Sequence, residues 1–85
     1  MAQLLKNEKF PIDLIYVPTK RRSTLDPKKV EALAVAILEK GQQSPILVRR
    51  DGERLVLVEG LHRLEAMKAL GETKILCTNV QARRS

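Results

Sequence analysis

The segment Glu59-Gly60-Leu61-His62-Arg63 holds the residues with the greatest chemical potential in this chain of 85 residues. An apolar run typical of a buried strand precedes it, and a pattern typical of an amphipathic helix follows it. The first N–H groups of a helix have no partner within the helix, and together with the helix dipole they favour an anion. Gly60 lets a ligand approach the backbone closely, and His62 and Arg63 add side-chain donors. We therefore expect an anion site here, above all for phosphate.

Glu59 and His62 are the candidate catalytic residues of this turn. A carboxylate beside a phosphate is repelled unless it binds Mg²⁺ or takes up a proton. A catalytic or magnesium-bridging role for Glu59 and a plain carboxylate at a helix start both fit the sequence. His62 is the only histidine of the chain and can serve as a phosphate donor or as a general acid or base. Arg63 either contacts phosphate or forms a surface ion pair with Glu59 or Glu65.

Strands and helices must hold this turn in place, and hydrophobic spacing predicts where they lie. The expected strands are residues 10–17, 45–50, 54–58 and 74–80, and the expected helices are residues 27–40 and 61–70. Asp51-Gly52 is a hairpin turn between the second and third strands. The order strand, helix, strand, strand, helix, strand predicts an α+β domain, in which two helices pack on a small mixed sheet.

The first expected helix has clear start and stop signals. Asp26 is placed as its N-cap, Pro27 as its first residue and Gly41 as its end. Its packed face is expected to consist of Val30, Leu33, Ala34, Ile37 and Leu38.

The chain reads as one small domain, residues 10–80, between a flexible N-terminus (1–9) and a basic tail (81–85). The basic loop 19–24 contains Lys20, Arg21 and Arg22. A solvated loop, a triphosphate contact and a DNA-backbone contact are all consistent with this loop. No apolar run approaches transmembrane length and the N-terminus lacks a signal-peptide pattern, so we expect a cytoplasmic protein without a membrane partner.

Composition narrows the class of partner. A formal net charge of +6 favours a polyanion, either a nucleotide or a nucleic-acid backbone. One Phe, one Tyr and no Trp argue against an RNA module that stacks bases on aromatic rings. The single cysteine, Cys77, lies in an apolar stretch and is expected to be a buried structural thiol. One Cys and one His are too few for a dedicated zinc site, and we assign no protein side chain to a metal except Glu59 through Mg²⁺.

Five short motifs occur in an order that resembles the ParB/sulfiredoxin-like superfamily. They are Leu-x-x-Val-Pro at 14–18, Leu-Asp-Pro-x-Lys-Val at 25–30, Gly-Gln-Gln-x-Pro-Ile-x-Val at 41–48, Gly-x-His-Arg at 60–63 and Leu-Gly-x-Thr at 70–73. The likeness covers residues 12–80 and implies the ParB/sulfiredoxin fold. It also implies binding of ATP or another nucleoside triphosphate, with Mg²⁺ as a further cofactor. The implied nucleotide-binding residues are Gly60, Leu61, His62 and Arg63 for the phosphates, Lys29 toward the base or sugar, and Arg21 or Arg22 from the loop before the first helix.

Departures from the family pattern decide which activities to expect. Leu61 stands where sulfiredoxins have their cysteine, so sulfinic-acid reduction by that chemistry is excluded. Ala32 and Ala36 replace hydroxyls that face the base in sulfiredoxins. Free-serine kinases of the superfamily have a carboxylate just before the glycine that assists phosphoryl transfer, and Glu59 occupies that position.

Three functions follow from the resemblance. The first is a domain that binds a nucleoside triphosphate, with ATPase or kinase activity toward a hydroxyl left open. The second is a DNA-associated ParB-like partition domain, although the second phosphate motif and the helix-turn-helix of DNA-clamping ParB proteins do not occur in these residues. The third is a degenerate sulfiredoxin-like module that binds a protein partner. The sequence does not choose the base, the phosphoryl acceptor or the oligomeric state, or distinguish a complete protein from an excised domain.

Overall fold

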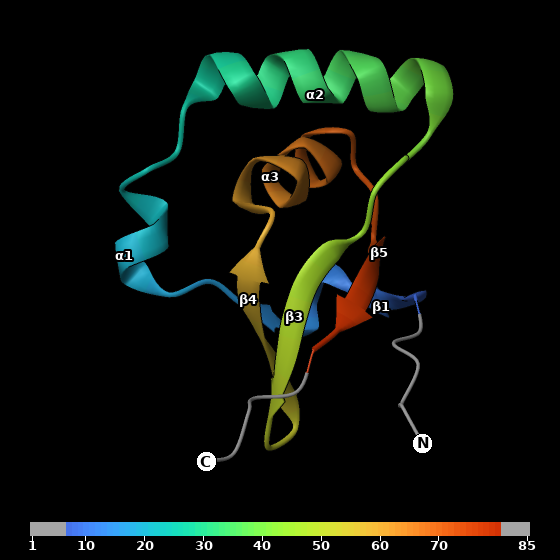
Figure 1. Ribbon diagram of the computed structural model, residues 1–85. Helices are drawn as coiled ribbons and strands as arrows, with labels where there is room; N and C mark the ends of the chain where they lie inside the picture. Colours follow the sequence, from blue (N-terminus) through green and yellow to red (C-terminus); the bar gives the residue numbers. More distant parts are fainter. Residues whose placement is uncertain (1–6, 81–85) are drawn as a thin grey trace.

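A computed structural model describes residues 7–80 as a mixed sheet with helices stacked on one side (Figure 1). The strands are β1 (Asn7–Pro11), β2 (Ile15–Tyr16), β3 (Ile46–Asp51), β4 (Arg54–Glu59) and β5 (Lys74–Asn79). The helices are the 3-10 helix η1 (Ile12–Leu14) and the α-helices α1 (Thr19–Arg22), α2 (Pro27–Lys40) and α3 (Leu61–Ala69). The α+β class and the mixed sheet are confirmed.

The strand order is β1-β5-β3-β4-β2. β3 and β4 form an antiparallel hairpin, and β1 pairs antiparallel with β5. β5 lies parallel to β3, and β2 lies parallel to β4. The hairpin turns at Gly52, whose φ of +65° suits a glycine, and Asp51 pairs with Arg54 across it at 3.3 Å. The predicted Asp51-Gly52 turn is therefore confirmed.

The hydrophobic core lies between the sheet and α3. Its most buried side chains come from the three central strands and from α3, and they are Ile46, Val48, Leu55, Leu57, Leu64, Ile75 and Cys77. Cys77 is 0% exposed, which confirms the expectation of a buried thiol. Because α3 follows β4 after a single residue, its packing on the core fixes the turn at Gly60 in space.

The N-terminal strand expected over 10–17 is wrong, because the chain there is divided between the two edges of the sheet. β1 pairs with β5 at one edge, and the short β2 pairs with β4 at the other. One extended strand cannot reach both edges, so η1 turns the chain after Pro11, and the Ile12 N–H bonds to Thr73 O at 2.9 Å. Residues 7–9 belong to β1 rather than to a flexible N-terminus. Residues 1–6 and the predicted basic tail, 81–85, lie outside the described residues.

The basic loop expected over 19–24 contains the short helix α1, so the described domain has an additional helix. Pro18 precedes it with φ −58° and ψ 143°, an extended conformation from which a helix can start. Two hydroxyls close its end: Ser23 Oγ donates to Lys20 O, and Thr24 Oγ1 donates to Arg21 O at 2.7 Å. These local bonds from side chains to backbone carbonyls satisfy the end of α1 without any partner from another strand or helix of residues 7–80.

α2 lies across α3, on the side away from the sheet (Figure 1). Its predicted limits are confirmed: Asp26 Oδ1 accepts from the Lys28 N–H at 3.0 Å, and Gly41 ends the helix with φ +79°. The packed face is only partly as expected, since Leu38 is 75% exposed. A helix that packs on one other helix covers a narrow stripe, and no residue of α2 is fully buried. None of the helices within residues 7–80 is long and apolar enough to cross a membrane.

Candidate functional site

The turn between β4 and α3 has a backbone that only glycine suits. Gly60 has φ +115° and precedes the first residue of α3. A Cβ atom at this position would lie 2.5 Å from Ile46 Cγ2, well inside van der Waals contact. Gly60 is therefore required by the close approach of β3, independently of any ligand. The same geometry leaves the N–H groups of the first turn of α3 without partners in the helix.

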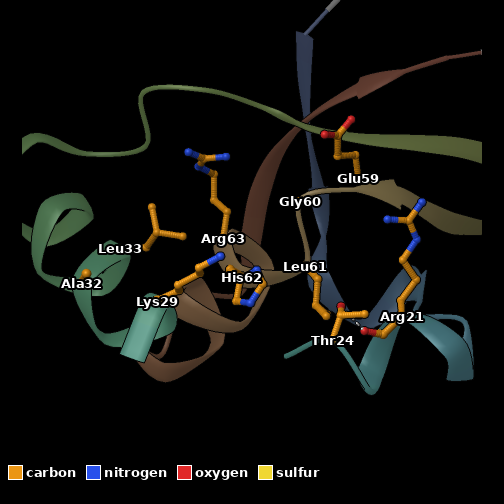
Figure 2. Close-up of a pocket in the computed structure, with 10 residues that line it drawn as sticks. All are labelled: Arg21, Thr24, Lys29, Ala32, Leu33, Glu59, Gly60, Leu61, His62 and Arg63. Atoms are coloured by element: carbon orange, nitrogen blue, oxygen red, sulfur yellow. Dashed lines mark hydrogen bonds between the residues drawn. The ribbon is translucent and has the colours of Figure 1, made fainter. Parts of the chain in front are cut away.

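A cavity of about 530 Å³ opens in front of this turn and is here called the α3 cavity (Figure 2). Its walls come from α1, the first turns of α2, the end of β4 and the start of α3. The lining residues are Arg21, Thr24, Lys29, Ala32, Leu33, Glu59, Gly60, Leu61, His62 and Arg63. Every residue predicted for nucleotide binding or catalysis is among them, with the exception of Arg22. Of the two arginines of the basic segment, Arg21 lines the cavity and Arg22 does not.

Three cationic side chains and one carboxylate line the α3 cavity. Figure 2 shows the guanidinium groups of Arg21 and Arg63 extending on opposite sides of the turn. Within residues 7–80 the ion pairs are Arg54–Asp51 and Lys68–Glu65, and neither involves a cation of the cavity. The sequence left open a pairing of Arg63 with Glu65, but Glu65 instead lies 3.3 Å from Lys68 Nζ. Uncompensated positive charge next to free N–H groups suits an anionic ligand.

His62 links the start of α3 to the start of α2. Its Nε2 accepts a hydrogen bond from the backbone N–H of Asp26 at 2.9 Å, and the side chain is half-buried. A ring nitrogen that accepts carries no proton, so in the neutral ring the proton is on Nδ1. Nε2 is therefore not available to donate to a phosphate, whereas Nδ1–H is.

Leu61 contributes to both the core and the cavity. It is 6% exposed and belongs to the hydrophobic cluster beneath α3. Its side chain therefore presents an aliphatic surface, with no nucleophile at this position of the turn. Cys77 lies on β5 outside the cavity lining, and burial raises the pKa of its thiol to about 11, against a weaker opposing hydrogen bond from the backbone of Phe10.

Two lining residues, Thr24 and Leu33, are not assigned to the site by the sequence. The apolar spacing places Leu33 only in the packed face of the helix, but it shares one helical face with Lys29 and Ala32 at spacings of three and four residues. That spacing, counted from Lys29, is the sequence signal that identifies the wall of the cavity formed by α2. Thr24 has no such signal, since its position depends on the fold of α1.

Acidic side chains are scarce at the cavity. Glu59 is its one carboxylate among the lining residues, and the described part of the chain has no group of three or more His, Cys, Asp or Glu suited to a metal ion. A divalent cation at this place would need most of its oxygen ligands from a bound phosphate and from water.

Comparison with known proteins gives relatives of the whole domain. The sequence profile described as ParB N-terminal domain matches residues 3–84. A probable chromosome-partitioning protein ParB from Campylobacter jejuni is 34% identical over 74 residues, which cover 84% of this chain and 27% of that protein. The chain thus spans little more than a quarter of the length of this relative.

Solved structures show the same fold. A sulfiredoxin from Arabidopsis thaliana has a TM-score of 0.82 and 30% identity, with 91% of this chain and 86% of the sulfiredoxin covered. The C-terminally truncated chromosome-partitioning protein ParB from Caulobacter crescentus, complexed with CTP-γ-S, has a TM-score of 0.79 and 26% identity. That match covers 92% of this chain and 46% of the Caulobacter chain.

Proposed function

This chain belongs to the ParB N-terminal domain family, and we propose that it binds a nucleoside triphosphate in the α3 cavity. The observation that carries the proposal is that Arg21, Lys29 and Arg63 all line one cavity at the free N–H groups of α3. Backbone donors, a helix dipole and cations together favour a polyphosphate over a singly charged anion. The Caulobacter relative complexed with CTP-γ-S supports a nucleotide as the ligand class.

Each wall of the cavity would contact a different part of the nucleotide. The phosphates would rest on the N–H groups at Leu61, His62 and Arg63, with the Arg63 guanidinium gripping two oxygens. Arg21 would neutralise the phosphates from the opposite side. Lys29 and the neighbouring apolar wall of α2 would lie toward the ribose and base. This wall consists of aliphatic side chains, so it gives the base a surface to pack on and few side-chain donors to read it.

Phosphoryl transfer at this site would use Glu59 as the base. Its carboxylate would accept the proton of an attacking hydroxyl or water as the new O–P bond forms and the bond to the bridging oxygen breaks, releasing the nucleoside diphosphate. Phosphate oxygens and water would supply most of the ligands of Mg²⁺, which would neutralise charge on the transferring group. Because residue 61 is a leucine, the turn has no cysteine nucleophile. The buried Cys77 is not placed to substitute for one.

Calorimetry with ATP, ADP and CTP, with and without Mg²⁺, tests the binding proposal. We expect Arg63→Ala to weaken nucleotide affinity about 10- to 100-fold, because a charge-assisted bond to phosphate is lost. Arg49→Ala is the matched control, since it removes the same charge from an exposed position on β3 outside the cavity. It should change affinity less than about twofold. Wild-type protein that binds none of these nucleotides at millimolar concentration would refute the proposal.

Phosphate release or transfer tests the role of Glu59. We expect Glu59→Gln to lower the rate at least about tenfold while nucleotide binding is kept, because the amide cannot accept the proton. Glu53→Gln, in the exposed hairpin turn, is the control for the same chemical change. An unchanged rate in Glu59→Gln would remove this residue from catalysis and leave a site that only binds.

A further inference from the structure

We propose that His62 is a positioning residue, whose neutral Nε2 holds the first turn of α2, and with it Lys29, against the phosphate turn. The 2.9 Å hydrogen bond from the Asp26 N–H to His62 Nε2 carries the inference. It joins the two walls of the α3 cavity, one from α2 and one from the start of α3. Its consequence for ligands rests on the proposed nucleotide function, whereas the bond itself can be tested without any ligand.

Packing on α3, rather than on the sheet, holds α2 to the rest of the domain without burying any of its residues fully. Among the hydrogen bonds of residues 7–80, the one to His62 is the only one that connects the start of α2 with α3. A directional, half-buried bond can therefore decide where this end of the helix sits.

Asp26 transmits that position to Lys29 through the helix cap. Its carbonyl accepts from the N–H of Lys29 at 3.0 Å and from that of Val30 at 3.1 Å. Its carboxylate accepts from the Lys28 N–H at 3.0 Å. The N–H of Asp26 is thus engaged in the bond to His62, and its carbonyl oxygen and Oδ1 are engaged in the first turn of α2. A shift of Asp26 therefore moves the backbone of Lys29, whose side chain lines the cavity.

The proton arrangement of His62 follows from the same bond. An Nε2 that accepts a hydrogen bond carries no proton, so the ring proton is on Nδ1. The residue then does two things at once: Nε2 positions α2, and Nδ1–H stays free to donate to a phosphate. An Nε2–H tautomer would place two donors against each other and break the link.

NMR on the ligand-free chain tests the bond directly, because His62 is the only histidine. We expect ¹⁵N spectra to show Nδ1 protonated and Nε2 bare. We also expect His62→Ala to speed hydrogen exchange of the Asp26 amide at least about tenfold. The Gly41 amide, which bonds to Ile37 O at the other end of α2, should keep its rate and serves as the control. A proton on Nε2, or an unchanged Asp26 exchange rate, would overturn the proposal.

A double-mutant cycle tests the consequence for nucleotide binding. If His62 acts by placing Lys29, the loss of affinity caused by Lys29→Gln should be at least threefold smaller in the His62→Ala background. His62→Gln, whose Oε1 can accept from the Asp26 N–H, should restore both slow exchange and the Lys29 effect. The shorter His62→Asn should restore neither. Additive losses would overturn the positioning role. Absence of any nucleotide binding would refute the proposed function, and the NMR experiment would still decide whether the bond exists.

Discussion

At Gly60 both the backbone conformation and the packing of neighbouring atoms exclude a side chain. The φ of +115° disfavours any side chain, and the nearest neighbour of an added Cβ is Ile46 at 2.5 Å. Ile46 is itself 1% exposed in the core, so it cannot move aside freely. The turn that presents the N–H groups of α3 is therefore fixed by the contact between β3 and β4 as well as by the glycine conformation.

We expect Gly60→Ala to lower the free energy of unfolding by about 3 kcal/mol or more, since backbone strain and overpacking add. Urea denaturation followed by circular dichroism measures this loss. Gly71→Ala is the matched control: Gly71 also has a positive φ, +79°, but an added Cβ would meet nothing within 4 Å. It should lose only the backbone contribution, about 1–2 kcal/mol. Equal losses in the two variants would show that the Ile46 contact is unimportant.

At the level of the elements, the Gln42 side chain takes the place of a strand's backbone beside the start of β3. The first pairing of β3 with β5 joins Ile46 to Cys77, so Leu76 lies one residue before the ladder. Gln42 fills that place: its Oε1 accepts from the Leu76 N–H at 2.8 Å, and its Nε2 donates to Leu76 O at 2.9 Å. The connector between α2 and β3 is thereby attached to the sheet.

Gln42→Ala should therefore lower the free energy of unfolding by about 1–3 kcal/mol, because it leaves two partly buried backbone groups without partners. The neighbouring Gln43→Ala is a control with the same loss of an amide. Gln43 is exposed and bonds only to Lys40 O near the end of α2, so it should change stability by less than about 0.5 kcal/mol. Chemical denaturation of both variants makes the comparison, and similar losses would contradict the role given to Gln42.

At the scale of the whole molecule, the buried thiol couples stability to pH. Cys77 is 0% exposed at the centre of the core, so it can ionise readily only when the domain opens. Burial raises its pKa from an ordinary value of 9.0 to about 11. The unfolded state thus loses the proton first as pH rises. The contribution of Cys77 is fully present below the unfolded pKa and is lost as pH rises toward 11.

We expect the wild-type protein to lose about 2 kcal/mol of stability from this group between about pH 9 and pH 11. Cys77→Val keeps an apolar side chain of similar size and has no thiol, so its stability should fall less over the same range. The two proteins have every other side chain in common, so the difference between the two unfolding curves isolates Cys77. Parallel curves would contradict the coupling.

Local rules in the sequence determined much of this domain. Asp26, Pro27 and Gly41 set the limits of α2, because capping depends on neighbours within one helical turn. The hairpin at Gly52 follows equally from short-range backbone geometry, and the glycine between an apolar strand and a helix predicted the turn at Gly60, although Ile46 of β3 also restricts that position. The turn that ends β4 and most residues of the α3 cavity could therefore be predicted from the amino-acid sequence.

Tertiary structure alone decided the contacts between distant segments. Apolar spacing over residues 10–17 cannot show that β1 and β2 lie at opposite edges of the sheet. The strands with which they pair lie roughly 40 to 70 residues away in the sequence. Leu38 has the spacing of a packed residue, yet α3 is too narrow a surface to cover it. The choice of Arg21 over Arg22, and the bond from Asp26 to His62, depend on how α1 and α2 are placed over α3. Local propensity fixed the elements, and long-range packing fixed which side chains share the cavity.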